Sequence, residues 1–199
     1  MAWDIDRTKQ LLLDAATAEF SARGLAGARV DRIAASAGVN KERIYQYFGN
    51  KEQLFGTVLS NELALIMDAV PITGTGIEAI VDYAGRVFEY HCEHPQLARL
   101  TIWEGLELGS PVAEDFRRER SASKVEFVLA AVPTITREQA EDLLLTILTL
   151  ADGYQALTNL DRLYTGSTGA DASRRARRGA TIQATVRATL LDLTGQTGE

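Results

Sequence analysis

Residues 38–48 read GVNKERIYQYF, a short stretch rich in side chains that contact nucleic acids. If the stretch is helical, Ile44 and Phe48 lie four residues apart and point inward. The side chains left outside are then those of Lys41, Glu42, Arg43, Tyr45, Gln46 and Tyr47. Lysine and arginine neutralise phosphates or reach guanine, glutamine pairs with adenine, and tyrosine hydroxyls donate to phosphate oxygens. The alternative interpretation is a polar helix face that is merely solvated.

Two charged residues, Glu42 and Lys51, help to distinguish a DNA-binding face from a solvated one. An acid such as Glu42 is costly beside DNA unless it accepts from a cytosine N4 group or pairs with Arg43 or Lys41. Lys51 adds a positive charge at the start of the next helical stretch, where exposed N–H groups commonly hold a phosphate.

The elements that would position these side chains precede them directly. Stretch 31–37 is too short to be stable alone, and Ile33, Ala34 and Ala37 supply the face that it would bury. Gly38 then permits a tight turn, and Asn40 is placed to cap the next helix. Two short helices joined by a glycine turn are typical of a helix-turn-helix.

Helical periodicity extends over the rest of the chain, and no alternating stretch is long enough to predict a strand. We therefore expect an all-α fold of about nine helices, at 5–23, 31–37, 41–48, 51–69, 76–92, 95–108, 112–131, 137–160 and 173–193. Asn50 with Gln53, and Thr136 with Gln139, have the spacing of capping boxes. Gly24 is predicted, like the glycine at 38, to end a helix in the left-handed conformation.

Composition restricts the class of protein. The 199 residues carry a net charge of −6 and are 46% hydrophobic, which favours a folded chain. Residues 1–55 hold eight Lys and Arg against seven Asp and Glu, a balance of +1, which leaves −7 for residues 56–199. A polyanion is therefore tolerated only at the N-terminal end. One cysteine, no secretion signal and no long apolar stretch predict a cytoplasmic protein that does not enter a membrane.

The stretches LLDAATAEFSARG and VDRIAASAGVNKERIYQYFGNKEQLF, between Leu12 and Leu54, resemble the DNA-binding domain of the tetracycline-repressor (TetR) family. The residues that fit the family pattern are Ile33, Ala34, Ala37, Gly38, Val39, Ile44, Tyr45, Tyr47, Phe48, Lys51, Glu52 and Leu54. The resemblance implies a DNA-binding domain at 1–50 and an effector-binding and dimerisation domain at 51–199, with helix 51–69 connecting the two.

The same resemblance implies residue roles. Phosphate contacts fall on Asn40, Tyr45, Tyr47 and Lys51, whereas Lys41, Glu42 and Gln46 face bases, with Arg43 on the same outer surface. Many relatives have threonines just before their second helix, where this chain has Ala28 and Arg29. The usual cap is therefore in doubt, with Asp31 a poor substitute, while Arg29 offers a charge-assisted phosphate contact instead.

The last two long helical stretches are the expected dimer interface, since relatives form a four-helix bundle between subunits there. The predicted interface residues are Leu143, Ile147, Leu150, Tyr154, Ala180, Ala184, Ala188 and Leu191. Alanines four residues apart let helices approach closely. The alternative is that both helices simply complete the core of one subunit.

The middle of the chain is the expected effector-binding part. Its aromatic and thioether side chains suit a pocket for a small apolar or amphipathic effector, and the candidates are Met67, Tyr83, Phe88, Trp103, Phe127 and Tyr154. The alternative is an ordinary core, which such residues form more often. His91 and His94 are not expected to bind a metal, and the arginine run 174–178 is expected to pair with nearby acids.

These features predict a transcriptional repressor that binds a palindromic operator as a homodimer and is released by a small molecule. No catalytic motif, metal site or cofactor is expected, so an enzyme is disfavoured. A ligand carrier that keeps the helix-turn-helix as a scaffold is a second alternative, and an activator is a third.

Overall fold

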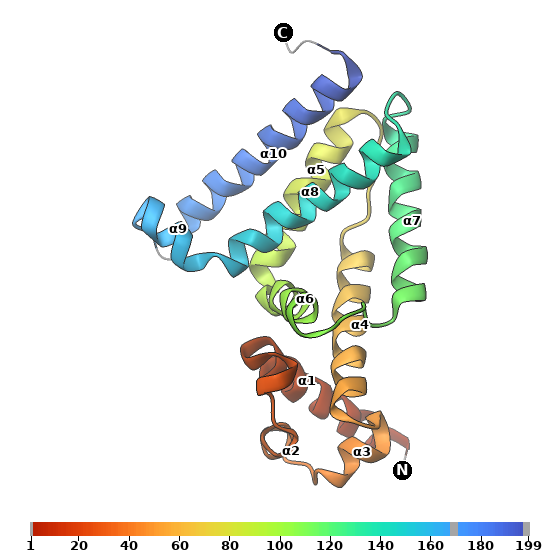
Figure 1. The fold of residues 1–199 in the computed structure, drawn as a ribbon, viewed down its shortest axis with the longest axis vertical. Coiled ribbons are helices and arrows are strands. Elements are labelled where there is room, and N and C mark those ends of the chain that lie inside the picture. Colours follow the sequence, from red (N-terminus) through yellow and green to blue (C-terminus); the bar gives the residue numbers. More distant parts are fainter. Residues whose placement is uncertain (1, 168–170, 197–199) are drawn as a thin grey trace. The chain divides into compact units, whose positions relative to one another are not determined.

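The computed structural model describes residues 2–167 and 171–196, and every regular element within them is an α-helix. Ten helices lie in this part of the chain, close to the number expected, and the all-α prediction is confirmed (Figure 1). Their bounds are α1 Ala2–Gly27, α2 Val30–Ala37, α3 Glu42–Phe48, α4 Lys51–Ala69, α5 Ile77–Glu93, α6 Pro95–Glu107, α7 Glu114–Ala131, α8 Arg137–Ala156, α9 Thr158–Thr165 and α10 Ala172–Thr194.

The additional helix arises because the stretch 137–160 is not a single helix, as the sequence had suggested. Leu157, with φ −100° and ψ 36°, ends α8, and its N–H donates to the Gly153 carbonyl at 2.9 Å. The chain turns there and restarts as α9 with Thr158 and Asn159, short polar residues that favour helix ends over helix interiors. No proline or glycine marks this break, so its position was not visible in the pattern.

The predicted helix ends are confirmed where the signals are local. Asn50 Oδ1 accepts from the Gln53 N–H at 2.8 Å, and Gln53 Oε1 accepts from the Asn50 N–H at 2.9 Å. Thr136 and Gln139 form the same reciprocal pair at the start of α8. Gly38 ends α2 with φ 66°. Each signal joins residues within one turn, and such contacts depend little on the rest of the fold.

Two compact units divide the chain. The first takes the residues up to Leu65 together with Gln96–Glu114, and the second takes Ile66–Pro95 together with the residues from Asp115 on. Helix α6 thus belongs with the helix-turn-helix in packing terms. The functional boundary expected between residues 50 and 51 is a different division, and it stays a prediction.

In the first unit, the core forms around the apolar stripe of α1. Leu12, Ala16 and Phe20 are fully buried, and the Phe20 ring meets the Phe55 ring edge to face at 5.2 Å. These residues recur every fourth position and so share one helix face.

Helix α6 packs against the C-terminal end of α1. Gly24 interrupts α1 with φ 67°, and a side chain there would collide with Trp103 and Glu107. The Trp103 Nε1–H donates to the Ser21 carbonyl at 3.3 Å, and the Ala26 N–H donates to Glu107 Oε2 at 2.9 Å. Gly24 thus makes room for α6, but it does not end α1 in the left-handed helical conformation that the sequence suggested: its ψ is −178°, and α1 continues to Gly27.

In the second unit, α5, α8 and α10 pack side by side (Figure 1). Gly85 and Gly179 allow the close approach of α5 and α10: a Cβ on Gly85 would lie 2.5 Å from the Gln183 amide nitrogen, and one on Gly179 would lie 3.3 Å from the Phe88 ring. No helix within the described residues is long and apolar enough to cross a membrane.

Candidate nucleic-acid interface

Helix α3 turns one residue into the core and leaves a polar face outside. Ile44 is fully buried, whereas Phe48 is half-buried. The predicted DNA-binding residues with exposed side chains are Arg29, Asn40, Lys41, Glu42, Arg43, Tyr45 and Gln46. Tyr47 and Lys51 are half-buried. The outer face of α3 is therefore accessible to a large partner such as duplex DNA.

Arg43 organises the middle of this face. Its Nη1 donates to Gln46 Oε1 at 3.1 Å and to Tyr47 Oη at 3.2 Å. Lys9 of α1 lies on the same ring, with Nζ 5.6 Å from the Tyr47 ring centroid. Two cations, Arg43 and Lys9, therefore lie close to Tyr47. They orient its side chain and keep its surroundings positively charged.

Lys41 is held at the start of α3 by an acid of α2. Its Nζ lies 3.3 Å from Asp31 Oδ1, and this hydrogen bond raises the pKa of Lys41 above its ordinary value. Arg29 lies 3.9 Å from the other oxygen of Asp31. Glu42 reaches ion-pair distance of neither Lys41 nor Arg43 within the described residues, although its charge contributes to the raised pKa of Lys41.

The N-terminus of α2 is capped by a residue that sequence reasoning missed. The Arg29 side chain does not cap α2, as the missing threonine led us to expect. The Asp31 side chain does not cap it either. Instead Glu19 of α1 accepts from the Arg29 N–H at 3.0 Å and from Arg32 Nε at 2.7 Å. Glu19 stands ten residues before Arg29, and no local spacing rule identifies such a cap.

Lys51 has a structural role at the start of α4. Its Nζ donates to the Ala28 carbonyl at 3.2 Å, which ties α4 to the loop between α1 and α2. An ammonium has three N–H groups, so two remain for other acceptors.

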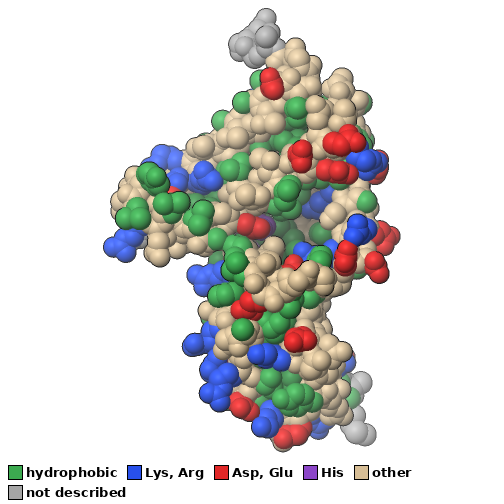
Figure 2. All heavy atoms as spheres, viewed as in Figure 1, with side chains coloured by type: hydrophobic (Ala, Val, Ile, Leu, Met, Phe, Trp, Pro, Cys, Tyr) green, Lys and Arg blue, Asp and Glu red, His purple; other side chains and the backbone are tan. Residues whose placement is uncertain are grey.

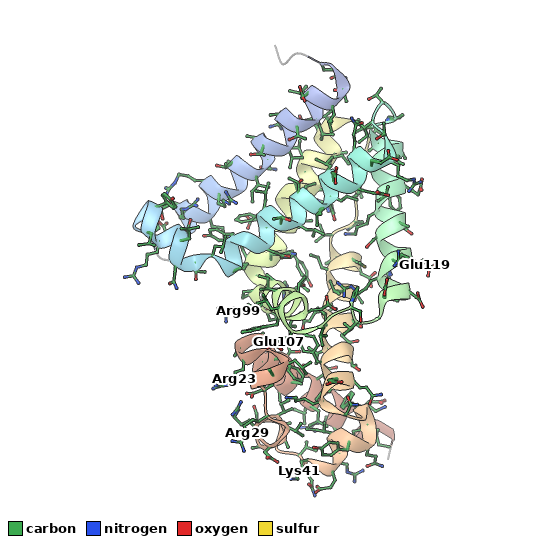
Figure 3. The ribbon with its side chains drawn as sticks, viewed as in Figure 1. Arg23, Arg29, Lys41, Arg99, Glu107 and Glu119 are labelled. Carbon is green, nitrogen blue, oxygen red and sulfur yellow. The ribbon has the colours of Figure 1, made fainter. Side chains whose placement is uncertain are left out.

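Basic side chains extend beyond α3 along one edge of the first unit. Figure 2 shows Lys and Arg side chains there, and Figure 3 labels Arg23, Arg29 and Lys41 on that edge. Their side chains are 56%, 66% and 53% exposed. This edge gives a locally positive surface on a chain whose net charge is −6.

The predicted dimer residues separate into two groups. Leu143, Ile147 and Tyr154 are buried within the second unit, so their side chains pack inside one subunit and not at its surface. Ala180, Ala184 and Ala188 are exposed, and Leu150 and Leu191 are half-buried. Apolar side chains that are exposed on α8 instead are Leu145 (64%) and Leu148 (39%).

The predicted pocket residues are also separated. Tyr83, Phe88 and Tyr154 are each buried in the second unit, but only the Phe88 and Tyr154 rings meet, at 5.3 Å. Met67 is half-buried. Phe127 is 57% exposed, and Trp103 is part of the first unit. We therefore withdraw Trp103 and Phe127 as pocket candidates, because neither side chain belongs to the interior of the second unit.

The arginines of the run pair largely as expected. Arg174 pairs with Asp161, and Arg175 pairs with Glu89 and Glu93. His91 lies 2.6 Å from Asp152, and the described residues contain no cluster with enough ligands for a metal.

The fold and the exposed face of α3 define a helix-turn-helix DNA-binding protein. Two family models match the chain: the bacterial regulatory proteins of the tetR family over residues 12–58, and the tetracyclin repressor-like C-terminal domain over residues 79–187. The chain belongs to the TetR family and is a DNA-binding transcriptional regulator, not an enzyme.

Individual relatives agree with this assignment. The chain is 38% identical to the HTH-type transcriptional repressor SCO4008 of Streptomyces coelicolor, over 86% of this chain and 89% of that protein. It is 27% identical to the HTH-type transcriptional repressor NicS of Pseudomonas putida, over 82% and 78%. A crystal structure of the transcriptional regulator SCO4942 from Streptomyces coelicolor superposes with a TM-score of 0.73, at 28% identity, covering 89% of this chain and 97% of that chain.

Proposed function

We propose that this regulator is a repressor that binds a palindromic operator as a homodimer and leaves it when a small molecule binds. The observation that carries the DNA-binding part is the face of α3, where polar and basic side chains surround a single buried anchor, Ile44. The repressor assignment is supported by the similarity to SCO4008 and NicS, which are both HTH-type transcriptional repressors. A protein with this role works in the cytoplasm.

The proposed contact roles are those that the resemblance to the TetR family implies for these positions. Lys41, Glu42 and Gln46 face base edges, whereas Asn40, Tyr45, Tyr47 and Lys51 contact phosphates. Arg29 and Arg43 add positive charge on either side of the helix. Phosphate contacts fix the position of the protein and base contacts select the sequence.

Homodimerisation is supported by exposed apolar area on the last long helices. Leu145 and Leu148 of α8, with Ala180, Ala184 and Ala188 of α10, leave apolar side chains in solvent. A second copy would cover them and form a four-helix bundle. Two reading helices then meet the same face of DNA one helical turn, or a multiple of it, apart.

Ligand release follows from linkage. If the effector stabilises a dimer whose reading helices are wrongly spaced, DNA and effector compete through one conformational equilibrium. Operator DNA must then weaken effector binding by the same factor as the effector weakens DNA binding. Helix α4, which contributes residues to both compact units, is the proposed lever.

A mobility-shift assay on the DNA upstream of the protein's own gene tests the proposal. We expect a shifted band, a footprint with two half-sites, and release on addition of the effector. The double variant Lys41→Ala/Tyr45→Ala should bind at least about tenfold more weakly, since it removes one base contact and one phosphate contact. Arg162→Ala, an exposed cation on α9, is the control. Unchanged affinity of the double variant at moderate salt would overturn the contact assignment.

A further inference from the structure

An ammonium group lies within the second unit without a carboxylate partner. Lys124 of α7 donates from Nζ to Tyr83 Oη of α5 at 2.8 Å, and Nζ lies 4.9 Å from the centroid of the same ring. Tyr83 is 1% exposed. Among the residues that the structure describes, Lys124 forms no ion pair. A lysine that is largely removed from water normally has such a partner.

Two guanidinium groups flank this lysine. Arg86 lies one turn after Tyr83 on α5, and its Nε donates to Asp82 Oδ2 at 2.7 Å. Arg120 lies one turn before Lys124 on α7, and its Nη1 donates to Asp68 Oδ1 at 3.0 Å. Three cations thus share two carboxylates, which leaves one positive charge without a counter-charge.

The electrostatic consequence falls on the lysine. Burial, followed by repulsion from Arg120 and Arg86, lowers the pKa of Lys124 to about 8. The protonated form of Lys124 is therefore electrostatically disfavoured, although it still predominates at neutral pH. An anion bound next to Lys124 would stabilise this protonated form.

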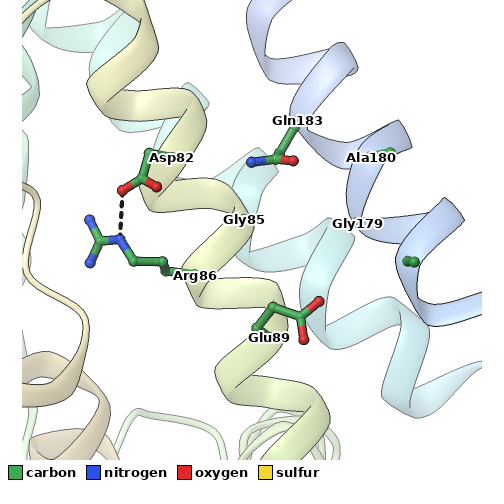
Figure 4. A pocket seen from close by; sticks show the side chains of 8 residues that line it. Asp82, Gly85, Arg86, Glu89, Gly179, Ala180 and Gln183 are labelled. Carbon is green, nitrogen blue, oxygen red and sulfur yellow. Dashed lines mark hydrogen bonds and ion pairs between the residues drawn. The ribbon is translucent and has the colours of Figure 1, made fainter. Parts of the chain in front are cut away.

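The same side chains also have unused hydrogen-bond donors but no unused acceptors. Arg86 Nη2 is sealed from solvent and has no acceptor within the described part of the chain. Figure 4 shows Arg86 and Asp82 directed away from α10. Because Tyr83 Oη accepts from Lys124, its own hydrogen is available to donate, and Lys124 has two more N–H groups. Every unused group is a donor, and buried donors without acceptors are costly.

We propose that Lys124, Tyr83 and Arg86, the cationic cluster, bind the carboxylate of the effector. The inference rests on the proposed function, in which the second unit holds an effector, and it specifies the chemistry of that effector as an amphipathic acid. A carboxylate supplies about four lone-pair sites and one negative charge, which match the unused donors and the surplus cation. Val128, one turn after Lys124 on α7 and fully buried, offers apolar surface beside the cluster for the rest of such a molecule.

Matched acids and amides test the proposal. Dodecanoate and 1-naphthoate are compared with dodecanamide and 1-naphthamide by titration calorimetry on the full chain. At least one acid should bind the wild type, and its amide should bind about tenfold or more weakly, because a charge-assisted hydrogen bond contributes at least that factor. This comparison depends on no variant.

Variants then locate the contact. Lys124→Met should weaken binding of the acid about tenfold or more and leave the amide unaffected, whereas Lys124→Arg should keep most of the acid affinity. Arg177→Gln, which removes an exposed cation of α10, should change neither. Operator binding by Lys124→Met without any acid present verifies that the variant is folded.

Two results would overturn the proposal: neither acid binds the wild type more tightly than its amide, or Lys124→Met binds the acid as tightly as the wild type. If the wild type binds operator while the acids fail, only the cationic cluster is refuted. If the wild type binds acid through Lys124 but binds no operator, the proposed function fails and the cluster stands.

Discussion

Glu19 and Arg32 form a hydrogen-bonded ion pair, with Arg32 Nε donating to Glu19 Oε1 at 2.7 Å, and the same oxygen accepts from the Arg29 N–H. The Glu19 side chain is 12% exposed. A carboxylate of α1 therefore lies at the N-terminus of α2, where the helix dipole favours negative charge. The contact joins the two helices that support the reading helix α3.

Removal of this charge should destabilise the helix-turn-helix. Glu19→Gln keeps the shape of the side chain but loses the ion pair, and we expect a loss of about 1–3 kcal/mol in the free energy of unfolding. Urea unfolding followed by circular dichroism measures it. Glu52→Gln, an exposed acid on the first turn of α4, is the control and should lose less than about 1 kcal/mol. Equal losses in both variants would contradict the role of Glu19.

The same pair predicts a pH dependence. The hydrogen bond from Arg32 lowers the pKa of Glu19 below 4.5. Because the folded pKa lies below the unfolded one, the contribution of Glu19 to stability is present above about pH 4.5 and is lost as the pH falls through the folded pKa. The stability difference between wild type and Glu19→Gln should therefore shrink on acidification from pH 6 towards pH 3. A constant difference over that range would exclude Glu19 as its source.

Gly24→Ala should destabilise the first unit strongly. The position combines φ 67° with a Cβ site only 2.4 Å from Glu107 Oε1 and 2.7 Å from the Trp103 ring. We expect a loss of about 2–4 kcal/mol in thermal or urea unfolding, from backbone strain and displacement of α6. Gly105→Ala, on α6 with open space around it, is the matched control and should be neutral or slightly stabilising. If Gly24→Ala matched this control, the close approach of α6 would be refuted.

Leu148→Glu should separate the proposed dimer. The side chain is 39% exposed on α8, so a carboxylate is tolerated in one subunit but is buried against its copy in the bundle. Analytical ultracentrifugation should show a monomer, and operator affinity should fall about tenfold or more as the second reading helix is lost. Leu163→Glu, on α9 at 82% exposure, should remain dimeric. Dimers of Leu148→Glu would exclude this face of α8 as the interface.

Stability should rise with pH in the alkaline range because of Lys124. Its folded pKa of about 8 lies below the ordinary 10.5, so the unfolded chain binds more protons between these values. Its destabilising effect is thus complete below about pH 8 and is relieved as the pH rises towards 10.5. The charged groups that face it are Arg86 of α5 and Arg120 of α7. Lys124→Met should be at least as stable as wild type at pH 7 and should gain less between pH 8 and 10; identical pH profiles would contradict the shift.

Local patterns predicted a large part of the fold. The four-residue spacing of Leu12, Ala16 and Phe20 placed these side chains in the core, and the capping boxes at Asn50 and Thr136 formed as expected. These interactions span one helical turn, and helix geometry alone brings such residues together. The exposed polar face of α3 is likewise a consequence of one buried anchor at Ile44.

Tertiary choices were not visible in the pattern. Helix α8 carries leucine and isoleucine on more than one side, so its sequence does not distinguish Leu143 and Ile147, which are buried in one subunit, from Leu145 and Leu148, which are exposed. The cap from Glu19 and the surplus cation at Lys124 depend on contacts between helices that are remote in sequence. Spacing rules contain no information on such contacts.

The bond between the Ala26 N–H and Glu107 has a consequence for how the protein is made. Its two residues are 81 positions apart, so an emerging chain cannot finish the end of α1 until α6 has left the ribosome. Nascent chains that stop near residue 65 leave Ala26 without this acceptor and Gly24 without the Trp103 and Glu107 side chains that lie close to it. The first unit therefore gains these contacts between α1 and α6 only after residue 107 has been made.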